Sequence, residues 1–221
     1  MITELWEYLT TPASKEARDE GHLYNSIALA QRARRCRGSW RPHLQQCHAL
    51  VADAIVEFQP KTVAILGSGL LLETPPELFD QESKVDFVDV VHNKDVRSKK
   101  LSPRFRLMEY NLNDKFPKDQ YDLIISANLL SQLPLTRPAD EAARLQLRHW
   151  NWLKNCGSKV LLYSDYQIQF LDDRGQLMES ESTVSESLNI EWHKEWLWDV
   201  APIPEYQSDT ALRFKMGAVL I

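Results

Sequence analysis

The sequence predicts an α/β fold, in which a doubly wound sheet of mostly parallel strands carries an antiparallel C-terminal strand and follows a group of N-terminal helices. Three observations predict it. Residues 1–58 are largely helical in pattern, short apolar runs alternate with helical or loop segments over residues 62–163, and two long strand-like segments close the chain. Alternating strands and helices are typical of a parallel sheet, because the crossover helices cover its faces.

Composition and charge are those of a soluble globular protein. Hydrophobic residues make up 43% of the 221 residues, enough for a sizeable core in one large domain. The formal net charge of -5 gives no sign of nucleic-acid binding. The first ten residues, MITELWEYLT, lack the order of a signal peptide, and no apolar run is long enough to span a bilayer. Three cysteines suit a reducing compartment, so we expect a cytoplasmic protein with no membrane partner.

The N-terminal quarter predicts three helices. The second covers residues 23–33 and ends at Gly38, and Ser39 is the expected N-cap of the third. The third helix, residues 41–58, carries a core-facing stripe at helical spacing that includes Cys47 and Val51. We therefore expect residues 1–39 to form an N-terminal helical segment, a candidate lid, and residues 40–221 to form the main domain.

Five short apolar runs predict the parallel strands, at residues 62–66, 84–89, 104–109, 121–126 and 158–163. The segments between them predict helices at residues 74–80, 129–133 and 139–153. Residues 167–171 and 176–179 flank a turn that contains Gly175, which indicates a hairpin. Residues 191–198 and 211–220 predict an antiparallel pair added to the edge of the sheet.

Residues 61–73, KTVAILGSGLLLE, are the central stretch of the sequence. An apolar strand meets the turn Gly67, Ser68 and Gly69, a pattern that predicts a buried strand turning into a helix beside a ligand. Glycines let a nucleotide-like ligand approach the backbone amides. Asp89 follows Gly69 by twenty residues and ends another apolar run, where a carboxylate accepts hydrogen bonds from ribose hydroxyls. Together they predict a nucleoside-cofactor site.

Over residues 40–221 the chain resembles the class I S-adenosylmethionine-dependent methyltransferases, which have a Rossmann-like sheet. The resemblance rests on the strand layout with its antiparallel ending, on the two glycines, on Asp89 and on residues 121–130, YDLIISANLL, which match the fourth-strand pattern of that superfamily. Ile65 and Leu71 stand where the family has an acidic residue and a third glycine. The stretch looks like a bacterial branch of the superfamily.

The resemblance implies S-adenosyl-L-methionine as cofactor and methyl transfer to an acceptor that the sequence does not identify. The acceptor is a small molecule or a macromolecule, and the acceptor atom is oxygen, nitrogen or carbon. It implies the cofactor-binding residues Gly67, Ser68, Gly69, Glu73, Asp89, Val90, Asn111, Leu112 and Ser126. His92 is the candidate general base, with a surface histidine as the alternative. Asn128 is the candidate for orienting the acceptor or the amino-acid part of the cofactor, with a cap of the next helix as the alternative. No metal is expected, although His43 and Cys47 form an i, i+4 pair.

Alternative interpretations remain open for several of these residues. Ile65 and Leu71 motivate a non-catalytic relative that keeps the fold as a binding or assembly module. A dinucleotide oxidoreductase is a third hypothesis, but its glycine pattern would need glycine at position 72, which is Leu72. A basic cluster with Trp40 inside it fits nucleic acid or another anion, but a solvated helix face is favoured; it comprises Arg32, Arg34, Arg35, Arg37 and Arg41.

Overall fold

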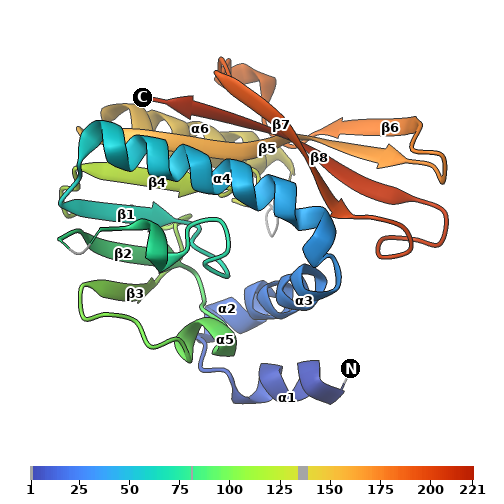
Figure 1. Ribbon diagram of the computed structural model, residues 1–221, viewed down its shortest axis with the longest axis horizontal. Helices are drawn as coiled ribbons and strands as arrows, with labels where there is room; N and C mark the ends of the chain where they lie inside the picture. Colours follow the sequence, from blue (N-terminus) through green and yellow to red (C-terminus); the bar gives the residue numbers. More distant parts are fainter. Residues whose placement is uncertain (1, 81, 134–138) are drawn as a thin grey trace.

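The computed structural model describes residues 2–80, 82–133 and 139–221, and these form an eight-stranded sheet with helices on both faces (Figure 1). The strand order is β3-β2-β1-β4-β5-β8-β7, and β6 pairs with β5 beyond this path. The strands are β1 (Thr62–Leu66), β2 (Lys84–Asp89), β3 (Phe105–Glu109), β4 (Leu123–Ala127), β5 (Lys159–Leu171), β6 (Leu177–Ser182), β7 (Lys194–Ala201) and β8 (Ala211–Leu220).

The helices lie before β1 and between the strands. In Figure 1, α4 crosses one face of the sheet, α6 lies behind the other, and α1 to α3 lie toward the side to which the β1 and β2 arrows point. The helices are α1 (Ile2–Thr10), α2 (Lys15–Asp19), α3 (His22–Arg35), α4 (Arg37–Phe58), α5 (Lys94–Arg97) and α6 (Ala139–Asn155), with 3-10 turns η1 (Pro76–Leu78) and η2 (Glu186–Leu188).

Strand pairing confirms the predicted layout. Strands β1 to β5 pair in parallel, whereas β8 pairs antiparallel with both β5 and β7. The first two predicted strands have the predicted bounds, and the C-terminal pair lies at the sheet edge. A dinucleotide fold continues into a second parallel half, so the antiparallel β7 and β8 argue against the oxidoreductase hypothesis.

Alternation along the strands divides the core into two layers. Val63 and Ile65 of β1 pack into the cluster that contains Cys47 and Val51 of α4. Ala64 and Leu66 point to the other face and join the cluster that contains Leu153 of α6 and Val160 of β5. Successive side chains on a strand face opposite ways, so a strand buried on both faces is apolar along its buried length, as β1 is from Val63 to Leu66.

The boundary between the second and third helices differs from the prediction. Helix α3 ends at Arg35 and α4 begins at Arg37, so Gly38 and Ser39 lie in the first turn of α4. Ser39 is therefore not an N-cap, and the junction is at Cys36, whose side chain is buried among apolar neighbours. Gly38 and Ser39 locally favour a helix end and a helix start, but the packing of Cys36 places the boundary between α3 and α4 before them.

Two predicted helices are wrong. The glycine stretch does not turn into an α-helix: after it, residues 74–80 contain only the 3-10 turn η1. Leu71 has a positive φ of 56°, and Pro75 and Pro76 follow it, so no regular helix forms there. Residues 129–133 form a hydrogen-bonded turn instead of a helix. Asn128 before them has a φ of 49°, and proline follows Leu133 in the sequence.

The C-terminal strands are confirmed with changed bounds. The fifth parallel strand and the first arm of the predicted hairpin are one strand, β5, which runs through to Leu171 with a register shift between Asp165 and Gln167. Strand β6 supplies the other hairpin arm. Strand β7 begins at Lys194, later than predicted. In Figure 1 the β5–β6 hairpin projects beyond the parallel sheet.

The N-terminal helices pack beside the end of β2. Ala17 of α2, and Leu23 and Ile27 of α3, form a small buried cluster with Val91, against which Val90 also packs. Both valines directly follow Asp89. The division at residue 39 falls inside α4, so the separate N-terminal segment stays a prediction. Among the described residues, no helix is long and apolar enough to cross a membrane.

Candidate cofactor site

The glycine turn is held against β2 by backbone hydrogen bonds. The amides of Gly67 and Ser68 both donate to the Val88 carbonyl, at 2.9 and 3.1 Å. Gly67 and Gly69 have φ values of 75° and 50°, in the left-handed region that favours glycine. The sequence therefore places glycine where the backbone conformation requires it.

Gly67 also permits a close approach between chain segments. A Cβ on this residue would lie 2.7 Å from the Ala127 carbonyl oxygen and 3.0 Å from the Cβ of Leu129. By contrast, a Cβ on Gly69 would meet only the Gly67 carbonyl, at 3.8 Å. The first glycine thus lets the end of β1 lie against the end of β4, while the second leaves space beside the turn.

Asp89 joins the end of β2 to the glycine turn. Its Oδ2 accepts a hydrogen bond from the Gly69 amide at 2.7 Å, and its Oδ1 accepts one from the Val90 amide at 2.7 Å. The side chain is half-buried. Because each carboxylate oxygen has two lone pairs, both oxygens retain capacity for hydroxyl donors.

Ser68 and His92 form a buried pair behind the turn. The Ser68 hydroxyl lies 2.9 Å from His92 Nε2, and Glu109 Oε1 lies 3.3 Å from His92 Nδ1. The ring of His92 is fully buried. Although burial opposes it, hydrogen bonds from His92 and the charge of Arg97 lower the pKa of Glu109 overall. This arrangement supports the turn; the role of His92 as general base stays a prediction.

Asn111 contacts the N-terminal segment. Its Nδ2 donates to Oε1 of Glu16 on α2 at 2.5 Å, and its Oδ1 accepts from the Asn113 amide at 2.9 Å. Val90 packs against the α2 and α3 cluster, whereas Leu112 is buried in the cluster on the α6 face. The side-chain amide of Asn111 is thus engaged by a helix far away in the sequence.

Ser126 points away from the glycine turn. Its hydroxyl lies 2.9 Å from Nε2 of His149 on α6, and both side chains are fully buried. Burial, with a smaller effect of the nearby Arg148 charge, lowers the pKa of His149 from 6.5 to about 3. Among the described residues, His149 Nδ1 has no hydrogen-bond partner. A neutral ring that donates from Nε2 to Ser126 leaves only an unpaired acceptor at Nδ1.

Asn128 lies at the end of β4 beside β5. Its Oδ1 accepts from the Asp165 amide at 3.0 Å, and its own amide donates to the Tyr163 carbonyl at 2.8 Å. Asp165 is buried, accepts the Ser131 hydroxyl at 2.5 Å, and has its pKa raised by burial. Asn128, Ser131 and Asp165 thus form a hydrogen-bonded polar cluster beside the carboxyl end of β4. The backbone of Asn128 is in the left-handed region.

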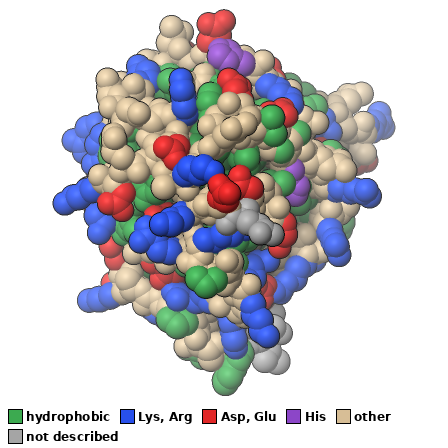
Figure 2. Space-filling model, turned by 60° about the vertical axis from the view of Figure 1, so that its left-hand side comes forward, with side chains coloured by type: hydrophobic (Ala, Val, Ile, Leu, Met, Phe, Trp, Pro, Cys, Tyr) green, Lys and Arg blue, Asp and Glu red, His purple; other side chains and the backbone are tan. Residues whose placement is uncertain are grey.

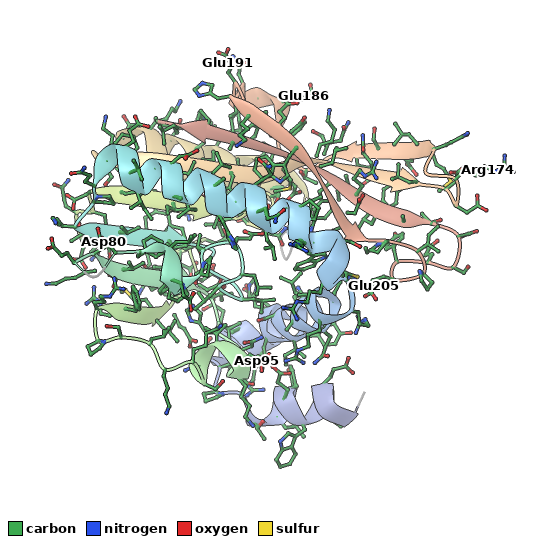
Figure 3. The ribbon with its side chains drawn as sticks, in the orientation of Figure 1. Asp80, Asp95, Arg174, Glu186, Glu191 and Glu205 are labelled. Atoms are coloured by element: carbon green, nitrogen blue, oxygen red, sulfur yellow. The ribbon has the colours of Figure 1, made fainter. Side chains whose placement is uncertain are left out.

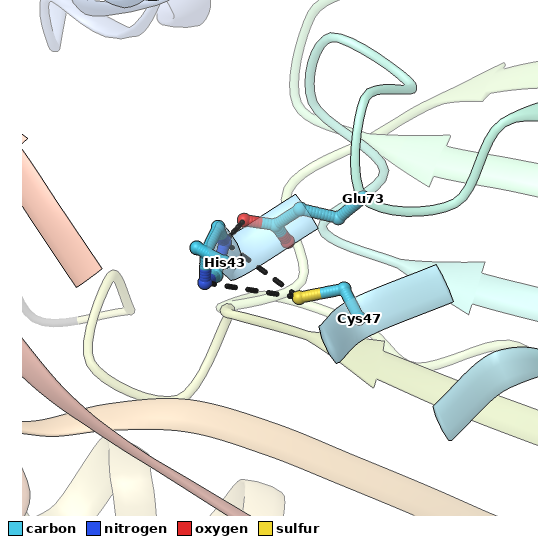
Figure 4. Close-up of side chains that lie close together, drawn as sticks. All are labelled: His43, Cys47 and Glu73. Atoms are coloured by element: carbon cyan, nitrogen blue, oxygen red, sulfur yellow. Dashed lines mark hydrogen bonds and ion pairs between the residues drawn. The ribbon is translucent and has the colours of Figure 1, made fainter. Parts of the chain in front are cut away.

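Glu73 faces helix α4 (Figure 4). Its Oε1 lies 3.0 Å from His43 Nε2, and the Glu73 side chain is 19% exposed while His43 is fully buried. Cys47 Sγ lies 3.6 Å from the same His43 nitrogen. Glu73 is therefore placed beside the glycine turn by a contact with α4.

The structure thus assembles part of the predicted set at one edge of the sheet. Most of the set follows the carboxyl ends of β1 to β4: the turn, Glu73, Asp89, Val90, His92, Asn111 and Asn128. Ser126 and Leu112 instead turn their side chains into the core. Sequence reasoning missed Glu16, His149 and the His43–Glu73 contact. The i, i+4 pair of His43 and Cys47 was the only sequence signal for the last of these.

The three arginines of the basic cluster that lie on α3 are paired with Asp95 and Glu205, two acids that Figure 3 labels. Arg35 donates to both oxygens of Glu205 at 2.8 and 2.7 Å, and Arg34 pairs with Asp95. Arg32 lies 3.5 Å from Glu205. On the side of the molecule shown in Figure 2, Lys and Arg side chains are interspersed with Asp and Glu. The pairing favours a solvated helix face over an anion-binding surface.

Comparison with solved structures returns methyltransferases at low similarity. A Burkholderia thailandensis 1,6-didemethyltoxoflavin-N1-methyltransferase with bound S-adenosylhomocysteine is 12% identical with a TM-score of 0.46, and the match covers 89% of each chain. The N-methyltransferase NodS from Bradyrhizobium japonicum, also with S-adenosylhomocysteine, is 15% identical with a TM-score of 0.43, over 79% of this chain and 86% of NodS.

A magnesium protoporphyrin IX methyltransferase from Synechocystis is 13% identical with a TM-score of 0.43, over 79% of each chain. No protein-family model and no curated protein sequence matches the chain. The residues of this chain themselves form a doubly wound, mostly parallel sheet with an antiparallel ending and a glycine turn joined to an acid at its carboxyl edge.

Proposed function

We propose that this protein is an S-adenosylmethionine-dependent methyltransferase. The observation that carries the proposal is the hydrogen bond from the Gly69 amide to Asp89, at the carboxyl edge of a sheet ordered β3-β2-β1-β4-β5-β8-β7. In open α/β sheets, ligands bind outside the carboxyl ends of the strands, where the strand order reverses. The order reverses between β1 and β4, next to the glycine turn.

The residues at this edge fit a nucleoside cofactor. Asp89 is half-buried and keeps acceptor capacity for two ribose hydroxyls, and the space beside Gly69 allows close approach to the backbone. S-adenosyl-L-methionine, when bound, supplies a methyl group on a positively charged sulfur. Such a transfer needs no covalent intermediate with the protein, so alignment and exclusion of water are the main tasks of the chain.

Each residue then has a defined task. Asp89 binds the ribose, Asn111 contacts the adenine, and Asn128 orients the acceptor at the end of β4. The acceptor atom is left open, and so is its class, small molecule or macromolecule. The lack of a nucleophile in the turn is no objection, because Ser68 hydrogen-bonds to His92 and has no role in the transfer itself.

We expect Asp89→Ala to weaken the binding of S-adenosylhomocysteine by about 10- to 100-fold, because a charged acceptor of two ribose hydrogen bonds is lost. Isothermal titration with S-adenosylmethionine and S-adenosylhomocysteine measures this. Asp114→Asn is the matched control, since Asp114 is an exposed acid in the segment after β3. Failure of both ligands to bind the unaltered protein at high micromolar concentration would contradict the proposal.

A non-catalytic binding module is the second candidate. The observation that favours it is the burial of Ile65 and Leu71, which places no carboxylate at the end of β1. Leu71 packs in the core with Cys47 of α4. This packing explains why leucine, and not glycine, stands at this position, and it involves no catalytic role. Cofactor binding without transfer of a labelled methyl group to small molecules, RNA or protein from a cell extract would favour this candidate.

The N-terminal segment is proposed as a lid over the cofactor site, because Glu16 holds the Asn111 amide. We expect Glu16→Ala to tighten S-adenosylhomocysteine binding by about two- to tenfold, since Asn111 no longer has to exchange partners. Isothermal titration measures the change. Asp19→Asn, on the same helix, serves as control, and equal affinities for Glu16→Ala and the unaltered protein would count against the lid.

A further inference from the structure

Helix α4 holds the segment that follows the glycine turn. His48 Nε2 lies 2.7 Å from the Leu72 carbonyl oxygen, and His43 Nε2 lies 3.0 Å from Oε1 of Glu73. Residues 70–80, the described stretch directly after the turn, contain no α-helix, and Leu71 has a positive φ. The two histidines therefore supply the side-chain support for Leu72 and Glu73 from a neighbouring element.

The hydrogen bonds around His43 define its tautomer. The indole nitrogen of Trp196 on β7 lies 3.0 Å from His43 Nδ1, and indole N–H is a donor only. Nδ1 must therefore accept, which leaves the proton of the neutral ring on Nε2. That proton points to Glu73. The ring is also stacked on Trp198 at a centroid distance of 4.0 Å, which fixes its plane.

The same tautomer argues against a metal ion at this place. His43, Cys47 and Glu73 offer ligand atoms that lie within 4.8 Å of one another. A metal on Nε2 would need the lone pair of that nitrogen, and the proton would then sit on Nδ1, facing the Trp196 donor. Burial raises the pKa of the Cys47 thiol, so the neutral thiol is favoured. The geometry suits a hydrogen-bond chain better than a coordination site.

We propose that Trp196 and His43 are positioning residues that hold the Glu73 carboxylate as the binding site for a primary ammonium group of the ligand in the glycine turn. The inference rests on the proposed function, in which the cofactor carries such a group on its amino-acid part. Glu73 is partly exposed beside the turn, and a carboxylate that accepts one hydrogen bond from His43 retains further acceptor sites.

Two ligands separate recognition of the ammonium group from general support of the site. S-adenosylhomocysteine carries the amino-acid part, whereas 5′-methylthioadenosine lacks it. We expect Glu73→Gln and His43→Phe to weaken S-adenosylhomocysteine binding by about tenfold or more in isothermal titration, and 5′-methylthioadenosine binding by less than about twofold. Glu77→Gln, an exposed acid on η1, should change neither. Equal losses for both ligands would overturn the proposal.

Trp196→Phe keeps a ring and removes only the indole donor. It should weaken S-adenosylhomocysteine binding by about two- to fivefold, and it provides a test if His43→Phe fails to fold. Nitrogen-15 NMR of the ligand-free protein should show the Nε2–H tautomer of His43. The opposite tautomer would overturn the proposed series of hydrogen bonds from Trp196 through His43 to Glu73. Stoichiometric zinc binding that Cys47→Ala abolishes would also overturn it.

These outcomes are distinct from failure of the proposed function. If neither nucleoside ligand binds the unaltered protein, the methyltransferase proposal falls and this inference falls with it. If S-adenosylhomocysteine binds with an affinity that depends on Asp89 but not on Glu73 or His43, only the ammonium site is wrong.

Discussion

Gly67→Ala is expected to lower the free energy of unfolding by about 2–4 kcal/mol, the sum of backbone strain and overpacking. The backbone at Gly67 has a φ of 75°, and the new Cβ would lie 2.7 Å from the Ala127 carbonyl oxygen. That oxygen belongs to β4, so relief requires β1 and β4 to separate at the carboxyl edge of the sheet. Urea denaturation followed by circular dichroism measures the loss, and S-adenosylhomocysteine binding should fall with it.

Gly175→Ala is the matched control for Gly67→Ala. Gly175 has nearly the same φ, 77°, but a Cβ there would meet nothing within 4 Å. Strain alone should cost about 1 kcal/mol at this hairpin turn. The difference between the two variants therefore reports the close approach of β1 and β4, and equal losses would show that this approach contributes nothing.

Stability should fall as the pH is lowered from 6.5 toward 3, in part because of His149. Burial holds the pKa of this histidine at about 3 in the folded protein, whereas an unfolded chain has the ordinary value of 6.5. Between these values the unfolded chain binds a proton that the folded protein does not, so the stabilisation present above pH 6.5 is lost as the pH falls. At pH 4.5 the loss is about 3 kcal/mol.

His149→Gln tests this, because glutamine can still donate to Ser126 and does not titrate. The free energies of unfolding of the two proteins, measured in urea at pH 7.5 and 4.5, should differ less at the lower pH. His193→Gln removes an exposed histidine and should leave the pH dependence of the unaltered protein intact. Parallel curves for His149→Gln and the unaltered protein would contradict a buried neutral ring.

The parallel sheet could be predicted because its strands are short, apolar and buried on both faces. β1 and β2 have the predicted bounds, since local pattern and packing agree there. Helix boundaries were less predictable: Gly38 and Ser39 favour a break, yet burial of Cys36 places the junction two residues earlier. The helix predicted after the glycine turn fails because left-handed backbone at Leu71 and two prolines act together.

The candidate site was predictable where one short motif carries it. Asp89 and Gly69 lie twenty residues apart in the sequence, and the structure brings them together in a hydrogen bond. The orientation of Ser126 was not predictable, because the choice between sheet faces at the end of β4 depends on His149 across the core. The contacts of Glu16 and His43 were beyond sequence reasoning for the same reason: each partner lies on another element.

The burial of Trp40 has a consequence for the biosynthesis of the protein. Its indole nitrogen donates to the Val200 carbonyl, 160 residues later, and its ring meets Trp198 edge to face. A nascent chain emerging from the ribosome therefore leaves Trp40, near the start of α4, uncovered until β7 has been made. Such long-range closure slows folding and prolongs the exposure of apolar surface. The layer that covers Trp40 and His43 is thus completed only after most of the chain has been translated.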